Sequence, residues 1–338
     1  MKRILILFLF LTYTASHTQE ISGFENFIFA SEYDRDILAK RYFSPLFNSA
    51  QISMSEGWVK TAKTHKKLGF DFTFFVSGVN IPFSAREFSV DDLSGITSSS
   101  NQSPTIFGIE SEEAYTVVFS PQNEDYSLST SFAVPSGYED LLTSDRAILP
   151  NLQFSLGVPF KTELIFRYMP ESKIKGAGIK SFGLGVKHSI SQYFNTAKVT
   201  PFNLSLLITS SKMEASYNFG DSSDISGSNQ STNLNIDNIS GGLVASIDLK
   251  VVSFYASVSQ VFSESSLSIN GTYNLNYISS SAGVVEIEIS DPISIKNQLN
   301  YFRKNVGFGF NLSLFNLFVD YSIQEYNSIN LGVSLGIR

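Results

Sequence analysis

Residues 303–338 alternate between apolar and small or polar side chains, and this alternation constrains the fold more than any other feature of the chain. From residue 306 to 314 every second residue is apolar, and the pattern recurs over 317–323 and 329–337. Successive side chains of a strand point to opposite faces of a sheet, so the alternation predicts three consecutive strands. The intervening positions are mostly Gly, Ser, Asn, Asp or Gln.

Two properties of these runs favour a transmembrane barrel over a soluble β-sandwich. Each run is about ten residues long, which is the length that a tilted strand needs to cross a bilayer. The non-apolar face is typical of a water-filled lumen. We therefore predict an all-β chain that forms a transmembrane antiparallel β-barrel, with a large soluble all-β domain as the alternative.

The composition agrees with a barrel and excludes several classes of protein. Charged residues make up 16% of the chain and aromatic residues 14%, as expected when one face of every strand contacts lipid. After residue 13 no segment is apolar enough for a membrane helix, which needs about 20 apolar residues. A net charge of −7 with one short basic tract argues against nucleic acid as a partner. The absence of cysteine excludes disulfides and thiolate metal sites.

The N-terminus predicts export. Residues 1–19 resemble a secretory signal peptide, because Lys2 and Arg3 precede a short apolar run that ends in small and polar residues. We expect an exported chain of alternating strands in the outer membrane of a Gram-negative bacterium, in contact with outer-membrane lipid. We expect residues 20–67 to form an N-terminal helical plug and residues 68–338 to form the barrel.

The best helix candidate is residues 31–48, where apolar side chains recur at helical spacing. Ser31 is expected to cap the first turn, and Pro45 is expected to kink or restart the helix. Because the helix precedes the first strand, we expect it on the periplasmic side, sealing the bottom of the barrel. Plugging of the lumen is the alternative.

The alternation predicts about fourteen strands, within a range of twelve to fourteen, and an even number is expected for a bacterial barrel. The first strand begins at Phe70, and residues 81–149 are expected to be an extracellular excursion with one strand pair that includes Ala114–Ser120. Short periplasmic turns are predicted at 159–161, 249–251 and 315–316. Long extracellular loops are predicted at 170–177, 220–235 and 290–302.

Two segments carry a resemblance to a known family. The run Gly57-Trp58-Val59-Lys60-Thr61-Ala62-Lys63-Thr64-His65-Lys66, followed by Gly69-Phe70-Asp71, resembles the GW..TAK.HK..GFD start of an uncharacterised family of outer-membrane barrels. The turn that begins at Gly157 is similar to the GLPKGTEL turn of that family, although Phe160 and Lys161 depart from it. The layout is similar to barrels of the FadL type, the long-chain fatty acid transporters. The resemblance implies a fold and a location, and it assigns no chemistry.

The charged side chains predicted to face the lumen form the first candidate site. By strand parity we expect an acid-rich ring, with the last two members placed higher than the others: Asp71, Glu163, Lys187, Asp248, Arg167 and Asp320. A basic segment enters at the same level and contains Lys60, Lys63, Lys66 and Lys67. One interpretation is a salt-bridge network that fixes the plug. The other is a gate on a translocation path.

Inward apolar side chains predict a partly apolar lumen pocket, lined by Phe75, Ile165, Leu207, Val244, Tyr255 and Phe318. Of the histidines that follow the signal peptide, neither His65 nor His188 has a readable Ser or Asp partner, so we predict no enzyme, no metal site and no cofactor. Two functions remain. The first is a FadL-like channel for small hydrophobic or amphipathic molecules. The second is a non-transporting barrel that supports another envelope protein.

Overall fold

The chain folds around a closed antiparallel barrel. The computed structural model describes residues 23–120, 126–138, 145–174, 176–194, 201–219 and 225–337, so the predicted signal peptide lies outside the described residues. The wall runs from β1 through β7 to β12 and on through β14 to β16, which pairs back to β1. The ten wall strands are β1 (Phe70–Asn80), β7 (Arg146–Val158), β8 (Thr162–Ile174), β9 (Ala177–Ser189), β10 (Phe202–Asn218), β11 (Gly227–Asp248), β12 (Val252–Ser279), β14 (Ile293–Leu312), β15 (Phe315–Ile323) and β16 (Ser328–Ile337).

Four further strands extend the same sheet without closing the wall, so the predicted count of about fourteen barrel strands is wrong. They are β3 (Ile96–Thr97), β5 (Ala114–Phe119), β6 (Leu128–Ala133) and β13 (Gly283–Ser290). The predicted strand at 114–120 is therefore present, but it lies beside the barrel. A separate two-stranded sheet pairs β2 (Glu87–Ser89) with β4 (Gln102–Pro104).

The wall strands differ greatly in length, and this explains the wrong count. β15 and β16 have 9 and 10 residues, whereas β11 and β12 have 22 and 28. Most of the loops predicted at 170–177, 220–235 and 290–302 are therefore strand. One end of the barrel carries the tight connections at 158–162, 248–252 and 312–315, and we call it the short-turn end. The predicted turns there are correct within about three residues.

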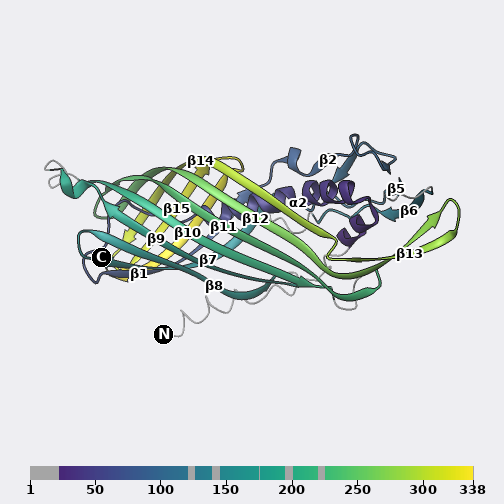
Figure 1. Ribbon diagram of the computed structural model, residues 1–338. Helices are drawn as coiled ribbons and strands as arrows, with labels where there is room; N and C mark the ends of the chain where they lie inside the picture. The colour runs from purple at the N-terminus through teal and green to yellow at the C-terminus, as the bar shows by residue number, and fades with distance from the viewer. Residues whose placement is uncertain are drawn as a thin grey trace, which may run out of the picture.

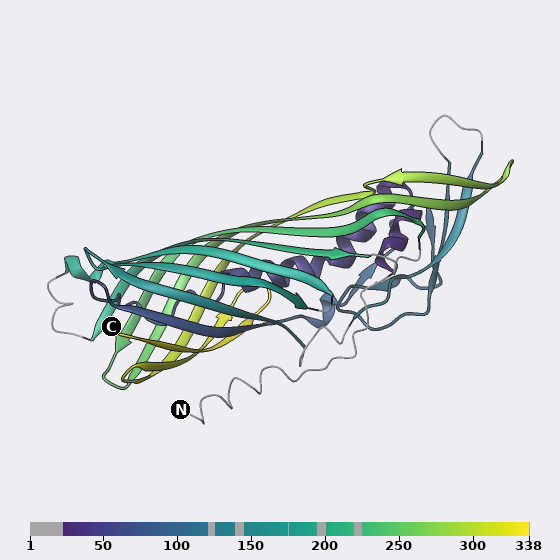
Figure 2. The ribbon, with the colours of Figure 1, turned by 90° about the horizontal axis from the view of Figure 1, so that it is seen from below.

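The long helix α2 (Glu32–Ser55) lies at the opposite end, inside the tall wall of β10 to β14 (Figures 1 and 2). We call this the helix end. Ser31 caps α2, because its hydroxyl accepts a hydrogen bond from the Asp34 N–H at 3.2 Å. The helix continues through Pro45 without a second start. Short 3-10 turns occur at η2 (Phe24–Phe29), η3 (Phe83–Ala85) and η5 (Ser191–Tyr193).

The predicted position of the helix at the short-turn end is wrong, and the reason is the chain that follows it. Residues 56–69 run from the end of α2 down the lumen to the start of β1 at the short-turn end. Such an extended segment spans up to about 3.3–3.6 Å per residue. It therefore carries the chain from Glu56, which contacts Ser322 and Asn330 near the helix-end tips of β15 and β16, down to the start of β1.

Helix α2 is also tied to residues 81–120 and 126–138, which cover it at the helix end. The guanidinium of Arg41 donates two hydrogen bonds of 2.7 Å to the carboxylate of Asp92. These hydrogen bonds lower the pKa of Asp92 to about 2. No helix among the described residues is long and apolar enough to cross a membrane.

The outer face of the barrel carries a belt of exposed apolar side chains in the half nearest the short-turn end. Every wall strand contributes to this apolar belt, for example through Phe72, Leu152, Tyr168, Leu184, Ile208, Leu243, Phe254, Phe308, Val319 and Leu331. The lumen face at the same height is polar, with residues such as Ser253 and Ser257 on β12. This half has the polarity of a protein surrounded by lipid.

Toward the helix end the polarity reverses along the same strands. On β10 the outward residues change from Ile208 to the charged Lys212 and Glu214, while Met213 is buried inside. Outward ion pairs join Lys212 to Asp237 at 2.7 Å and Lys180 to Glu214 at 2.8 Å. The inner face of this half packs on α2 in a core that includes Leu38, Phe47, Ile236, Leu267 and Ile295. The helix end therefore has the polarity of a water-soluble domain.

Candidate functional site

The lumen within the apolar belt is filled by residues 56–69, which we call the luminal segment. Its side chains and backbone contact the wall along its length. The Ser205 hydroxyl donates to the Ala62 carbonyl at 2.5 Å, and the Ala62 N–H donates to Ser246 at 3.1 Å. At the short-turn end the Leu68 N–H donates to the Gly157 carbonyl at 2.8 Å. The segment is thus built into the barrel as an internal strap.

Two glycines permit this close packing. Gly57 has a φ of +69°, and a Cβ there would lie 2.1 Å from the Phe75 ring. A Cβ on Gly157 would lie 2.0 Å from the Lys66 carbonyl oxygen. Residues other than glycine rarely adopt the positive φ of Gly57, and neither Gly57 nor Gly157 has room for a side chain. Both glycines belong to the segments that carry the resemblance to the uncharacterised family.

A buried charge cluster joins the luminal segment to the wall near the short-turn end. Lys60 donates to Asp71 at 2.5 Å and to Thr73 at 2.6 Å. His65 lies between two carboxylates, with Nδ1 at 2.7 Å from Glu163 and Nε2 at 2.9 Å from Asp71. The second contact has the distance of an ion pair without the alignment of a hydrogen bond.

The wall completes the charge cluster from β8 and β9. Lys187 lies 3.0 Å from Glu163, and its ammonium also donates to the Thr61 carbonyl at 3.3 Å. The His65 N–H donates to the same Glu163 carboxylate at 3.0 Å. Two lysines therefore face two carboxylates with the histidine between them. Buried charges are stable only when they are paired and hydrogen-bonded in this way.

The remaining predicted charges separate into three environments. Asp248 accepts hydrogen bonds from Thr61 at 2.6 Å and from Asn203 at 2.9 Å, so it fixes the same segment without an ion pair. Lys63, Lys66 and Lys67 are exposed and make no ion pair with the residues that the structure describes. Only Lys60 of the predicted basic segment therefore enters the charge cluster. Arg167 and Asp320 lie higher in the lumen.

Arg167 is fully buried against the start of the luminal segment. Its guanidinium donates to the carbonyls of Met54 at 3.2 Å and Glu56 at 2.7 Å. It also lies 3.8 Å from the centroid of the Trp58 ring and 4.9 Å from that of Phe75. Aromatic faces attract a desolvated cation. Arg167 thus fixes the junction between the end of α2 and the start of the luminal segment.

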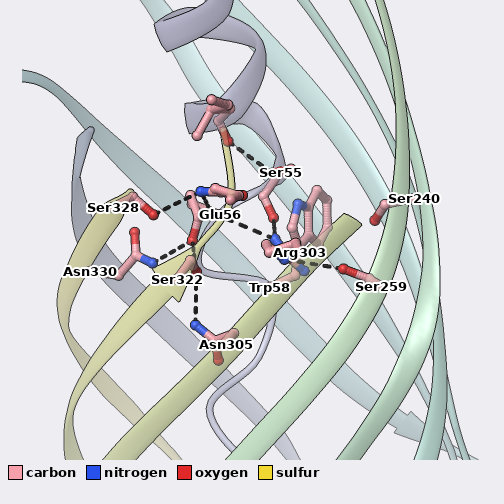
Figure 3. Close-up of polar contacts among 12 residues, drawn as sticks. Ser55, Glu56, Trp58, Ser240, Ser259, Arg303, Asn305, Ser322, Ser328 and Asn330 are labelled. Atoms are coloured by element: carbon pink, nitrogen blue, oxygen red, sulfur yellow. Dashed lines mark hydrogen bonds and ion pairs between the residues drawn. The ribbon is translucent and has the colours of Figure 1, made fainter. Parts of the chain in front are cut away.

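A second polar site surrounds Glu56 at this point (Figure 3). The Glu56 carboxylate accepts hydrogen bonds from Ser322 at 2.9 Å, Gln324 at 2.7 Å and Asn330 at 2.7 Å. Arg303 donates to the Ser55 carbonyl and to the Ser259 hydroxyl, and its guanidinium is 4.0 Å from Glu56.

Asp320 lies directly below Glu56 in the same network. Its carboxylate accepts from Asn330 at 2.6 Å, Asn305 at 2.7 Å and Tyr255 at 3.0 Å. Asn330 therefore bridges two carboxylates, since it also donates to Glu56. Four wall strands converge here on the end of one helix, and sequence reasoning did not single out Glu56 or Arg303.

The side chains predicted to line a partly apolar lumen pocket are inward, but the luminal segment occupies the space between them. Ile165, Leu207, Val244 and Tyr255 are buried against side chains of the luminal segment, namely Trp58, Val59 and Ala62. Phe75 and Phe318 face each other with ring centroids 6.4 Å apart. The parity argument found the inward side chains, but it did not include a strap of chain that fills the space between them.

An apolar cavity of about 210 Å³ lies instead at the helix end, between α2 and the wall. A smaller space of about 90 Å³ adjoins it and shares Leu46, Ile106, Ala177, Ala215 and Leu234. The larger cavity is lined by those residues and by Ser49, Ala50, Ser53, Phe107, Ala147, Ile148, Leu149, Ile179 and Met213. Sequence reasoning missed it, although the inward apolar residues of the helix end carried the signal.

The two histidines acquire partners that the sequence did not reveal. His65 contacts two carboxylates, as described above. His188 lies near the outer face, where Nδ1 is 2.8 Å from the Thr162 hydroxyl and Nε2 is 3.0 Å from the Tyr193 hydroxyl. The expectation that neither histidine has a Ser or Asp partner is therefore wrong for His65, which contacts Asp71, whereas the contacts of His188 described here are with Thr162 and Tyr193. No group of three or more His, Cys, Asp or Glu side chains arranged for a metal ion occurs among the described residues.

The chain belongs to a family of unknown function (DUF6588), whose model matches residues 1–337. No match was found among curated protein sequences. Similar solved structures include Ail of Yersinia pestis, with 8% identity, coverage of 80% of this chain and 99% of Ail, and a TM-score of 0.27. They include the translocator domain of the autotransporter NalP of Neisseria meningitidis, with 10% identity, coverage of 89% and 99%, and a TM-score of 0.31.

A FadL homologue of Pseudomonas aeruginosa is also similar, with 9% identity, coverage of 80% of this chain and 90% of the homologue, and a TM-score of 0.20. All three TM-scores lie below 0.5. The fold assignment therefore rests on the strand pairing of this chain itself.

Proposed function

We propose that this member of the DUF6588 family is an outer-membrane barrel of a Gram-negative bacterium that binds a small hydrophobic or amphipathic molecule beside α2. The signal-like residues 1–19 and the apolar belt support the location. All ten wall strands contribute to the belt. Such a continuous apolar outer surface is stable in a lipid bilayer.

The observation that carries the binding function is the cavity of about 210 Å³ between α2 and strands β7, β9, β10 and β11. Ligand sites are concave and mostly apolar, with a few polar groups that fix orientation. This cavity has that character, since its polar side chains are Ser49 and Ser53. It lies to one side of α2, at the helix end of the luminal segment.

Transport in the manner of a channel requires movement of the luminal segment. The lumen of the belt is packed, and the charge cluster closes it at the short-turn end. A molecule bound beside α2 therefore passes to the short-turn end only when residues 56–69 leave their place. The same packed lumen favours the second candidate, a non-transporting barrel that supports another envelope protein.

Ligand binding tests the proposal directly. Purified protein in lipid nanodiscs would be titrated with N-phenyl-1-naphthylamine, an uncharged apolar fluorophore. The Ala215→Trp variant fills the cavity and should weaken binding at least tenfold. The matched control is Ser210→Trp, which places the same side chain on the outer face of the same strand. Equal binding by wild type and Ala215→Trp would refute a ligand site beside α2 and leave the supporting barrel as the better candidate.

A further inference from the structure

The barrel wall opens between β7 and β8 at the upper edge of the apolar belt. These strands pair from Val158 opposite Thr162 up to Leu152 opposite Tyr168, and their pairing stops there. Both strands continue beyond this point. β7 remains paired to β1 as far as Arg146, and β8 remains paired to β9 as far as Ile174.

Two prolines explain why the pairing stops. Leu152 lies opposite Tyr168. If the strands continued to pair in this register, Pro150 would lie opposite Pro170, two residues further along each strand. Neither residue has an N–H to donate to a ladder, and proline within a sheet is confined to edges and bulges. The β8–β9 register also shifts between Met169 and Ser172, so β8 bulges at Pro170. The sequence itself thus prevents these two strands from closing.

The opening lies between the apolar belt and the cavity beside α2. Leu152 and Tyr168, the last paired residues, are both exposed members of the belt. Directly beyond them on β7, the residues Ala147, Ile148 and Leu149 line the cavity. On the far side of the opening the lining continues with β9, and none of the β8 residues 162–173 lines the cavity.

Outside, an apolar groove of about 480 Å³ leads along the belt to the same place. It is lined by residues of β1, β7, β8 and the adjoining strands, including Phe72, Leu152, Phe166 and Tyr168. The groove ends at Leu152 and Tyr168, where the pairing of β7 and β8 stops, and the cavity lining begins three residues further along β7 at Leu149. The outer groove and the inner cavity therefore lie on either side of the opening.

The lining of the cavity indicates the class of molecule. None of its side chains carries a charge, and the Ser49 hydroxyl already donates to the Leu46 carbonyl at 3.1 Å. A buried charged group without a partner is strongly destabilised. Nothing in the cavity would neutralise a carboxylate or a sulfonate. The site therefore suits an uncharged molecule.

We propose that uncharged, slender apolar molecules pass from the surrounding lipid into the cavity sideways, through the opening between β7 and β8 that Pro150 and Pro170 hold apart. This proposal rests on the proposed function, because it assumes that the belt is embedded in lipid and that the cavity binds a ligand. It adds the route of entry and the requirement for a neutral ligand.

The chain contains no cysteine, so a single introduced thiol reports on access. Ala215→Cys places the thiol in the cavity, and Ser210→Cys places a control thiol on the outer face of the same strand. Each variant in lipid nanodiscs would be treated with uncharged N-octylmaleimide and, separately, with a sulfonated methanethiosulfonate reagent. The fraction modified over time would be measured by mass spectrometry of the intact protein.

At each position we compare the rate of modification by the uncharged reagent with the rate by the charged reagent. We expect this ratio of rates to be at least tenfold higher at position 215 than at position 210. Adding Pro150→Val with Pro170→Val restores both N–H donors and should slow the uncharged reagent at position 215 about tenfold, with no change at position 210. Ala147→Phe, which narrows the opening with a bulky side chain, is a second variant in case the valine pair does not assemble.

Three outcomes overturn the proposal or its premise. Unchanged rates at position 215 in both blocked variants would show that entry does not occur between β7 and β8. Equal access for the charged reagent would show that the cavity opens to water. If neither reagent reaches position 215 while both reach position 210, the cavity is closed, and the proposed function fails together with the route.

Discussion

Replacing Glu163 with Gln should release the luminal segment while leaving the barrel closed. Glu163 is 1% exposed and holds three groups, namely the N–H and Nδ1 of His65 and the ammonium of Lys187. The Glu163→Gln side chain has nearly the same size, but it removes the negative charge. Lys187 would then be buried without a carboxylate partner.

The magnitude follows from the burial of the pair. Removing one partner of a buried ion pair typically costs about 3–5 kcal/mol. We expect a value near 3 kcal/mol, because His65 keeps its contact with Asp71 at 2.9 Å and some charge compensation remains. Each 1.4 kcal/mol is a factor of ten in an equilibrium constant. Opening of the luminal segment should therefore become about 100-fold more frequent, since the strand hydrogen bonds that close the barrel are untouched.

Hydrogen exchange of peptides covering residues 57–67 measures this opening, and limited proteolysis at the same segment checks it. Single-channel conductance then separates the two interpretations of the charge cluster. Faster exchange with new conductance would identify a gate, whereas faster exchange without conductance would identify a structural seal. Glu214→Gln is the matched control, because it breaks the exposed pair with Lys180 and should leave residues 57–67 unchanged.

The reasoning is refuted if Glu163→Gln assembles normally and residues 57–67 exchange at the wild-type rate. That result would mean that the backbone contacts of the luminal segment, such as those of Ala62 and Leu68, hold it without the charges.

Three further predictions test other parts of the structure. Leu331→Arg, in the middle of the apolar belt, should impair assembly in outer membranes by about 2–4 kcal/mol, whereas Gln298→Arg, on the outer face of β14 opposite Glu264, should assemble normally; equal assembly, followed by heat-modifiable gel migration, would contradict the position of the belt. Gly183→Val should displace Trp58, because a Cβ there would lie 2.8 Å from the indole ring; the emission of this only tryptophan should shift to the red, while Gly241→Ala, where a Cβ meets open space, should leave it unchanged. Ser31→Ala should destabilise the start of α2 by about 1 kcal/mol, seen as faster exchange at residues 32–36, and protection equal to that of wild type would show that the cap contributes nothing.

The sequence by itself determined the local structure and the parity of the strands. Alternation over 306–337 is a local property, because the side chains of any strand point to opposite faces whatever the strand packs against. It therefore placed Phe308 and Leu331 outward. The same parity in the strands near residues 70, 165 and 185 placed Asp71, Glu163 and Lys187 toward the lumen. The Ser31 cap was also readable, since it depends on residues that are neighbours in the chain.

The lengths of the strands could not be predicted from the sequence, because the outward side chains are apolar in one half of a long strand and polar in the other. Alternation continues through β10 to β14, but the apolar side lies on the outer surface in one half and faces α2 in the other. A strand segment with a polar outer face has a composition like that of a loop, and loops were therefore predicted at 220–235 and 290–302. This is why ten long strands were expected as about fourteen short ones.

Only the tertiary structure decided where the helix lies, what fills the lumen and where the wall opens. His65 meets Glu163 across 98 positions in the sequence, and Arg303 meets Ser55 across 248. The opening depends on Pro150 and Pro170 lying on adjacent strands in one register. Such contacts are set by the closure of the barrel, which fixes the relative height of every strand at once, and no local pattern of side chains contains that information.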